Sequence, residues 1–129
     1  MIGKLHPEEL KKYVLKYKGA ENKNVISGPD IGEDSAVIKL SSDNYLLVSS
    51  DPIVGADNEN IGKFLIEINV NDIAAKGGDP KYIMLNLLVP ENLGKPFIEK
   101  TMRDIDTSCK KYGISIIGGH TEITNKYSN

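Results

Sequence analysis

Three aspartates stand where carboxylates could bind a divalent cation. Asp34 closes a glycine-containing loop just before a predicted strand, and Asp51 follows the next strand. Asp72 lies near the end of a long predicted helix, on or beside its core-facing side. Ligands of open α/β sheets gather at the carboxyl ends of strands, and Mg²⁺ prefers a few carboxylates together with waters and phosphates. Together the aspartates suggest a magnesium site, whereas each one alone favours a turn or cap residue.

The segment Glu67–Pro80 combines a helical apolar pattern with polar residues that suit a helix poorly. Asn69, Asn71 and Asp72 have short side chains that compete for backbone hydrogen bonds. A carboxylate near the core is costly unless it is paired, hydrogen-bonded or bound to a cation. We interpret Asn69 alone as a solvated helix position. Asn71 and Asp72, followed by the helix stop Gly77-Gly78, leave a functional site and a structural role equally open.

Two glycine-containing segments could bring backbone N–H groups close to bound phosphates. The loop over residues 22–34 contains Gly32 and is acidic, so a metal ion would have to neutralise its charge against a phosphate. The segment Gly118-Gly119-His120-Thr121 follows a predicted strand, and its glycines allow a close approach of the backbone to a ligand. A tight turn with an exposed histidine is an equally good interpretation of this second segment.

Helical and extended patterns alternate along the chain and predict an α/β (α+β) fold. Strand–helix–strand crossovers imply parallel or mixed strand pairing. The helices are predicted over residues 7–17, from Asn58 as N-cap to about 76, and 96–112, and the strands over 36–38, 46–48, 82–89 and 114–117.

Apolar spacing predicts which faces of these elements are buried. The nearly continuous apolar run over residues 82–89 is typical of a strand buried on both faces. Cys109 falls on the apolar stripe of the last helix, so we expect a core residue rather than a nucleophile. The predicted stripes are Ile61, Phe64, Leu65, Ile68 and Ile73 in the long helix and Ile98, Met102, Ile105, Cys109 and Tyr112 in the last helix.

Length and composition limit the class of protein. The 129 residues suffice for one domain with a real core, and 40% hydrophobic with 26% charged residues are typical of a globular protein. A formal charge of −2 argues against a nucleic-acid partner. No apolar run reaches membrane-spanning length, and the single cysteine excludes an internal disulfide. We therefore expect a cytoplasmic protein with no membrane partner.

Four segments together resemble the aminoimidazole ribonucleotide (AIR) synthase superfamily. They stand in the order and spacing of that superfamily, and the resemblance runs from Gly28 to Thr124. The specific part is Asn-Asp-Ile-Ala-Ala-x-Gly-Gly-x-Pro, and it favours a functional site at Asn71 and Asp72. The segments are Gly32–Val37, Ser50-Asp51, Asn69–Pro80 and Gly118–Glu122.

The resemblance implies an amino-terminal domain that binds ATP and Mg²⁺ near a homodimer interface. Its mixed sheet would carry helices on one face and close into a barrel across the dimer. His120 departs from the acid that many members carry, and a histidine is a poor magnesium ligand, so a phosphate contact is expected. The implied metal ligands are Asp34, Asp51 and Asp72, and the implied nucleotide-binding residues also include Gly32, Asn71, Gly118, Gly119, His120 and Thr121.

The resemblance leaves several functions open. The hydrogenase-maturation branch, which uses ATP to activate an amide-like oxygen and could engage a maturation partner protein, is placed first. Alternatives are phosphoryl transfer of the thiamine-monophosphate kinase or selenophosphate synthase type, and a non-catalytic scaffold that binds nucleotide and dimerises. Complete members carry a further carboxy-terminal domain, so residues 1–129 are expected to form a single amino-terminal domain that is inactive alone.

Overall fold

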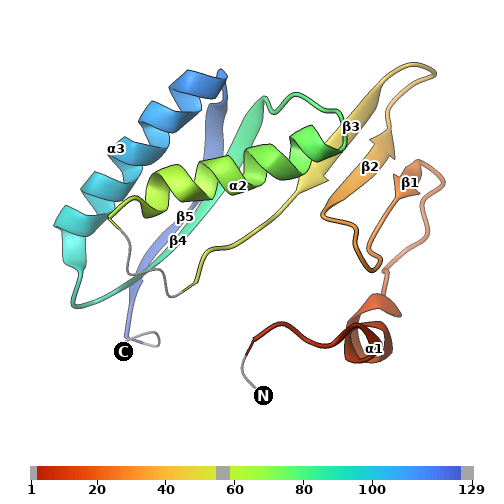
Figure 1. Ribbon diagram of the computed structural model, residues 1–129, viewed down its shortest axis with the longest axis horizontal. Helices are drawn as coiled ribbons and strands as arrows, with labels where there is room; N and C mark the ends of the chain where they lie inside the picture. The colour runs from red at the N-terminus through yellow and green to blue at the C-terminus, as the bar shows by residue number, and fades with distance from the viewer. Residues whose placement is uncertain (1–2, 55–58, 126–129) are drawn as a thin grey trace. The chain divides into compact units, whose positions relative to one another are not determined.

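A computed structural model of the chain describes residues 3–54 and 59–125 (Figure 1). The chain divides into two compact units, Met1–Ser50 and Asp51–Asn129. The predicted N-cap at Asn58 lies outside the described residues. No helix in the described ranges is long and apolar enough to span a membrane.

The first unit contains a short helical segment and an antiparallel sheet with the strand order β1-β2-β3. The predicted helix over 7–17 is in fact one α-helical turn followed by a π-helical turn, which together end at residue 15. The predicted hairpin is confirmed, and a third strand was missed because it is a short piece inside a Gly- and Pro-containing loop. The elements are α1 (Pro7–Leu10), η1 (Lys11–Leu15), β1 (Val25–Ser27), β2 (Ser35–Lys39) and β3 (Tyr45–Ser49).

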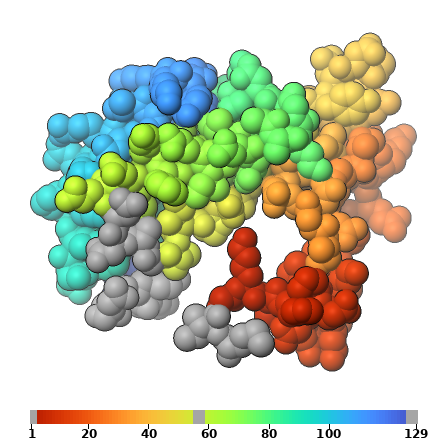
Figure 2. Space-filling model, viewed as in Figure 1, coloured from red at the N-terminus to blue at the C-terminus, as the bar shows by residue number. Residues whose placement is uncertain are grey.

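The second unit is a parallel strand pair with both helices on one face. β4 and β5 pair in parallel through the crossover helix α3, as the strand–helix–strand pattern predicts. α2 and α3 lie against each other on the face visible in Figure 2. Their contact with the sheet forms the core, which contains Ile66, Leu85, Ile105, Cys109 and Ile114. The elements are α2 (Ile61–Ala75), β4 (Tyr82–Pro90), α3 (Gly94–Tyr112) and β5 (Ser115–Thr124).

The buried face of α2 differs from the predicted stripe. Ile66 is fully buried, whereas Phe64 is 51% exposed. Gly62, one turn before Ile66, packs so closely on α3 that an added Cβ would lie 2.5 Å from the carbonyl oxygen of Thr101. An apolar pattern cannot reveal such a contact, because glycine brings two helix backbones together without being hydrophobic itself.

β4 is buried on one face, so the prediction of two buried faces was wrong. Exposed and buried residues alternate along the strand. Leu85 is 6% exposed, while its neighbour Met84 is 68% exposed on the open face. The sheets are also two separate small ones, and no barrel occurs among the described residues of the single chain. The α/β class is confirmed, and α2 and α3 lie on one face of the β4–β5 pair (Figure 1), whereas the predicted mixed sheet is in fact an antiparallel sheet and a separate parallel pair.

Glycines end both long helices, as predicted. After α2 the N–H of Gly77 donates to the carbonyl of Ala74, and the N–H of Gly78 donates to that of Ile73. Gly77 has φ 79°, a left-handed conformation that glycine adopts without steric cost. Gly113 ends α3 with φ 68°. These two stops determine where the chain leaves each helix to enter β4 and β5.

Cys109 is 2% exposed and belongs to the core, which confirms its predicted structural role. Burial raises the pKa of the Cys109 thiol, and the negative charge of nearby Asp106 raises it further. The thiol therefore stays protonated at neutral pH, and it lacks the thiolate character that a nucleophile requires.

Because folding raises the pKa of Cys109, this residue should make stability depend on pH. The contribution is fully present below the ordinary thiol pKa of about 8.5 and is lost as the pH rises through the higher folded value. Urea unfolding at neutral and alkaline pH should show a smaller alkaline loss for Cys109→Ala than for the wild type. Equal losses in both proteins, or rapid labelling of the native thiol at pH 8, would contradict this assignment.

Candidate functional site

In the first unit, an acidic turn presents the first of the predicted aspartates. Asp34 is exposed and immediately precedes β2. Gly32 has φ 80°, which lets the chain reverse direction just before it. The hydroxyl of Ser27 donates to the Glu33 carboxylate at 3.0 Å, so the turn is tied to β1. Gly32 and Asp34 are thus neighbours in a supported turn with an exposed carboxylate.

In the second unit, the side chain of Asn69 in α2 makes hydrogen bonds to the main chain of Asp51. The N–H of Asp51 donates to Asn69 Oδ1 at 3.2 Å, and Asn69 Nδ2 donates to the Asp51 carbonyl at 3.2 Å. Asn69 Nδ2 also donates to the carbonyl of Leu65, one turn earlier in α2, at 3.0 Å. The interpretation of Asn69 as a solvated helix position was therefore wrong. A partner 18 residues away in the chain leaves no signal in a local pattern.

The other predicted residues of α2 follow directly after Asn69. Asn71 is exposed, and Asp72 is half-buried. Asp72 comes three residues after Asn69, a spacing that places both side chains on neighbouring parts of one helix surface. The structure thus brings the main chain of Asp51 to the side of α2 that also bears Asp72. Their carboxylate oxygens are donors of the hard type that Mg²⁺ prefers.

Asp34 belongs to the first unit, and the other two aspartates belong to the second. Within neither unit, over the residues described, do three His, Cys, Asp or Glu side chains form a group that could hold a metal ion. The three-aspartate metal site therefore stays a prediction.

The Gly118-Gly119 segment is part of β5, which continues through it to Thr124. The prediction that the strand ends at residue 117, and the alternative of a tight turn, were both wrong. A Cβ added to Gly119 would lie 1.8 Å from the carbonyl oxygen of Leu85, and its φ is 147°. β4 thus requires glycine at this position whether or not a ligand is bound.

His120 and Thr121 lie side by side with residues of β4. The parallel register pairs His120 with Asn86 and Thr121 with Leu87. Asn86 is exposed and alternates with the buried residues of β4, so this pair lies on the open face of the sheet. His120 Nε2 lies 3.4 Å from Glu122 Oε2, and both side chains remain more than half exposed. His120 is therefore open to a ligand or a partner on that face.

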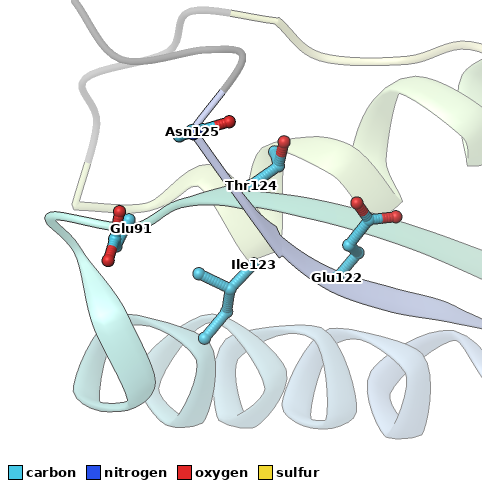
Figure 3. Close-up of a pocket in the computed structure, with 5 residues that line it drawn as sticks. All are labelled: Glu91, Glu122, Ile123, Thr124 and Asn125. Carbon is cyan, nitrogen blue, oxygen red and sulfur yellow. The ribbon is translucent and has the colours of Figure 1, made fainter.

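An open hollow near the ends of β4 and β5 borders the predicted site residues, because Glu122, which lies 3.4 Å from His120, is one of its lining residues. In Figure 3 Ile123 points toward α3, whereas the side chain of Glu122 points to the other side of the strand. The lining residues of the hollow are Glu91, Glu122, Ile123, Thr124 and Asn125.

A model of the family described as AIR synthase related protein, N-terminal domain, matches residues 32–129. The chain belongs to this family, as its sequence resemblance suggests. It is 31% identical to a thiamine-monophosphate kinase of Buchnera aphidicola over 112 residues, which are 81% of this chain and 34% of the kinase. It is 28% identical to a putative hydrogenase expression/formation protein of Methanocaldococcus jannaschii over 128 residues, 95% of this chain and 38% of that protein.

A solved structure of AaThiL complexed with AMPPCP and TMP is also similar. The TM-score is 0.66 with 26% identity, over 91% of this chain and 36% of that chain. The chain spans about a third of the length of the relatives it matches. Thiamine-monophosphate kinases predominate among these relatives, so the kinase alternative has stronger support than the hydrogenase-maturation branch that sequence analysis placed first.

The two glycines of β5 should respond differently to alanine. Gly119→Ala places a methyl group against the backbone of Leu85 and should prevent folding or cost more than about 3 kcal/mol. Gly118→Ala should cost about 1–3 kcal/mol, because its φ of 154° is strained for alanine while the nearest atom, Met84 Cε, is 3.9 Å away. Urea unfolding of both variants measures the difference, and equal losses would contradict the close contact.

Proposed function

We propose that this chain is the Mg-ATP-binding domain of a phosphoryl-transferring enzyme of the thiamine-monophosphate kinase type. The observation that carries the proposal is the structural similarity to AaThiL complexed with AMPPCP, an analogue of ATP, over 91% of this chain. The sequence similarity to thiamine-monophosphate kinases supports the same branch. In such a reaction the terminal phosphoryl group of ATP passes to the phosphate of thiamine monophosphate.

The proposed site residues carry donor groups of the kind that a magnesium-bound nucleotide requires. When bound, magnesium would neutralise phosphate charge and orient the phosphate chain. Asp51 and Asp72 supply oxygen donors from a loop and from α2, and Asp34 is proposed as the third donor. His120 is exposed on the open face of β5 and suits a phosphate oxygen better than a magnesium ion. Gly32, Asn71, Gly118, Gly119 and Thr121 are proposed to line the nucleotide site.

A hydrogenase-maturation function is the second candidate. The similarity to the Methanocaldococcus jannaschii protein covers 95% of this chain, more than the similarity to the kinases covers. ATP would then activate an amide-like oxygen of an acceptor, and a maturation partner protein would be needed. Both functions use the same magnesium nucleotide, so the acceptor distinguishes them.

The open face of the second unit supports a homodimer. Tyr82 is 70% exposed and Met84 is 68% exposed on β4, in a sheet of only two strands. Two-stranded sheets are marginal alone, and their unpaired edges are templates for further pairing. A second copy that covers this face, with strands closing into a barrel, would also place His120 near the interface. This arrangement agrees with a nucleotide site close to the dimer contact.

Replacing Asp72 tests the metal role directly. At ten times its Kd, Mg-AMPPCP should stabilise the wild type by about 1.4 kcal/mol, since a ligand stabilises the state that binds it. Asp72→Asn should remain folded without ligand and should lose most of this stabilisation. Melting curves with and without ligand measure the effect. A further rise in Tm with thiamine monophosphate would favour the kinase branch.

Asp79→Asn is the matched control, because Asp79 is an exposed carboxylate of the same segment that pairs with Lys81. It should keep the full ligand-dependent stabilisation. If Asp72 is structural instead, Asp72→Asn will lose roughly 1–3 kcal/mol equally with and without ligand. That outcome would reject the metal assignment.

The homodimer is tested by a charge on the open face. Met84→Glu should shift the chain toward monomer, because a buried unpaired carboxylate in the interface is costly. Light scattering after size exclusion at micromolar concentration measures the mass. Lys111→Glu introduces the same side chain at an exposed end of α3 and should leave the dimer intact. A monomeric wild type would refute the proposal.

A further inference from the structure

We propose that Asn69 is a positioning residue that holds Asp51 beside Asp72 for cation binding, an inference that rests on the proposed function. Its side chain makes hydrogen bonds to both main-chain groups of Asp51, each of 3.2 Å. A third bond of 3.0 Å ties the same amide to the Leu65 carbonyl within α2. These three hydrogen bonds therefore connect Asp51, in the loop after β3, to one turn of α2.

Only an amide side chain can make this set of contacts. The Asp51 peptide presents one donor and one acceptor, and the Asn69 amide offers the complementary acceptor and donor. The second N–H of the amide is used by Leu65. An aspartate at position 69 would lose both donors and add a negative charge next to Asp51. A leucine of similar size would lose all three bonds.

The hydrogen bonds from Asn69 restrict the backbone of Asp51 and leave its carboxylate available to bind a cation. Asn69 engages the N–H and the carbonyl of Asp51, not its side chain. The next residue is Pro52, and a residue before proline is confined to extended conformations. With both peptide groups held and the conformation limited, the direction of the Asp51 Cα–Cβ bond is set. The exposed carboxylate of Asp51 therefore extends toward a cation from a Cβ atom whose position is fixed.

Asp72 supplies the second carboxylate from the same helix. It follows Asn69 by three residues, a rise of about 4.5 Å along the axis, and lies on the neighbouring surface. Asn69 therefore links the main chain of Asp51 to the part of α2 that carries Asp72. Groups that orient a ligand residue typically change metal affinity by about 10–100-fold when they are removed.

The experiment uses the whole chain with Mn²⁺ and AMPPCP as the probe. Asn69→Leu should weaken Mn²⁺ binding at least about tenfold, measured from the spectrum of free Mn²⁺ in electron paramagnetic resonance. It should also raise the hydrogen-exchange rate of the Asp51 amide at least about tenfold in NMR, because that N–H loses its acceptor. Asn92→Leu, a change of the same type at an exposed residue of the turn before α3, should alter neither.

A double-mutant cycle with Asp51→Asn separates positioning from a purely structural role. If Asn69 acts through Asp51, Asn69→Leu should cause little further loss of Mn²⁺ affinity in the Asp51→Asn background. Independent, additive losses would overturn the proposal. The proposal would also be overturned if Asp51→Asn weakened Mn²⁺ binding while Asn69→Leu left the Mn²⁺ affinity unchanged. That result would not contradict the proposed function.

Two further outcomes are decisive. If Asp51→Asn leaves Mn²⁺ affinity unchanged, the metal role of Asp51 fails, and the positioning role fails with it. If Asn69→Leu does not fold, Asn69→Ala replaces it, since alanine is the best helix former and removes the same three bonds. Fast hydrogen exchange of the Asp51 amide in the wild type would show that its hydrogen bond to Asn69 is absent in solution. This result would overturn the proposal without any variant.

Discussion

The close contact between α2 and α3 at Gly62 determines where the candidate site can form. No side chain larger than hydrogen fits there, because an added Cβ would meet the Thr101 carbonyl oxygen at 2.5 Å. Ile66 and Ile105 are fully buried in the same layer. A helix held this way presents its remaining residues in fixed directions, and Asn69 contacts the main chain of Asp51. The site depends on helix packing as much as on its own polar groups.

The two faces of the β4–β5 pair differ in what covers them and in their composition. One face of β4 and β5 is covered by helices and supplies the core. The other face mixes exposed apolar residues of β4 with the polar pair His120 and Glu122 of β5. This composition is the basis of the proposed homodimer with a nucleotide near its interface. The glycine at position 119 keeps β5 close to β4 and so maintains this face.

Membership of the AIR synthase-related family fits the distribution of the predicted residues. They lie on a turn, a loop, a helix and a strand. Relatives with different names match the same part of the chain, which spans about a third of their length. The acceptor must be identified by binding experiments rather than by the fold of this domain.

The sequence by itself determined the types of the two long helices and of the strands β2 to β5, the stops at Gly77 and Gly113 and the core position of Cys109, because periodicity and backbone preference act over a few residues. It also determined the family, through the segment around Asn71 and Asp72. The tertiary structure decided that Ile66 rather than Phe64 is buried, that Gly119 serves the β4 contact, and that Asn69 holds Asp51. Each of these depends on a partner distant in the chain, and local patterns carry no information about such partners.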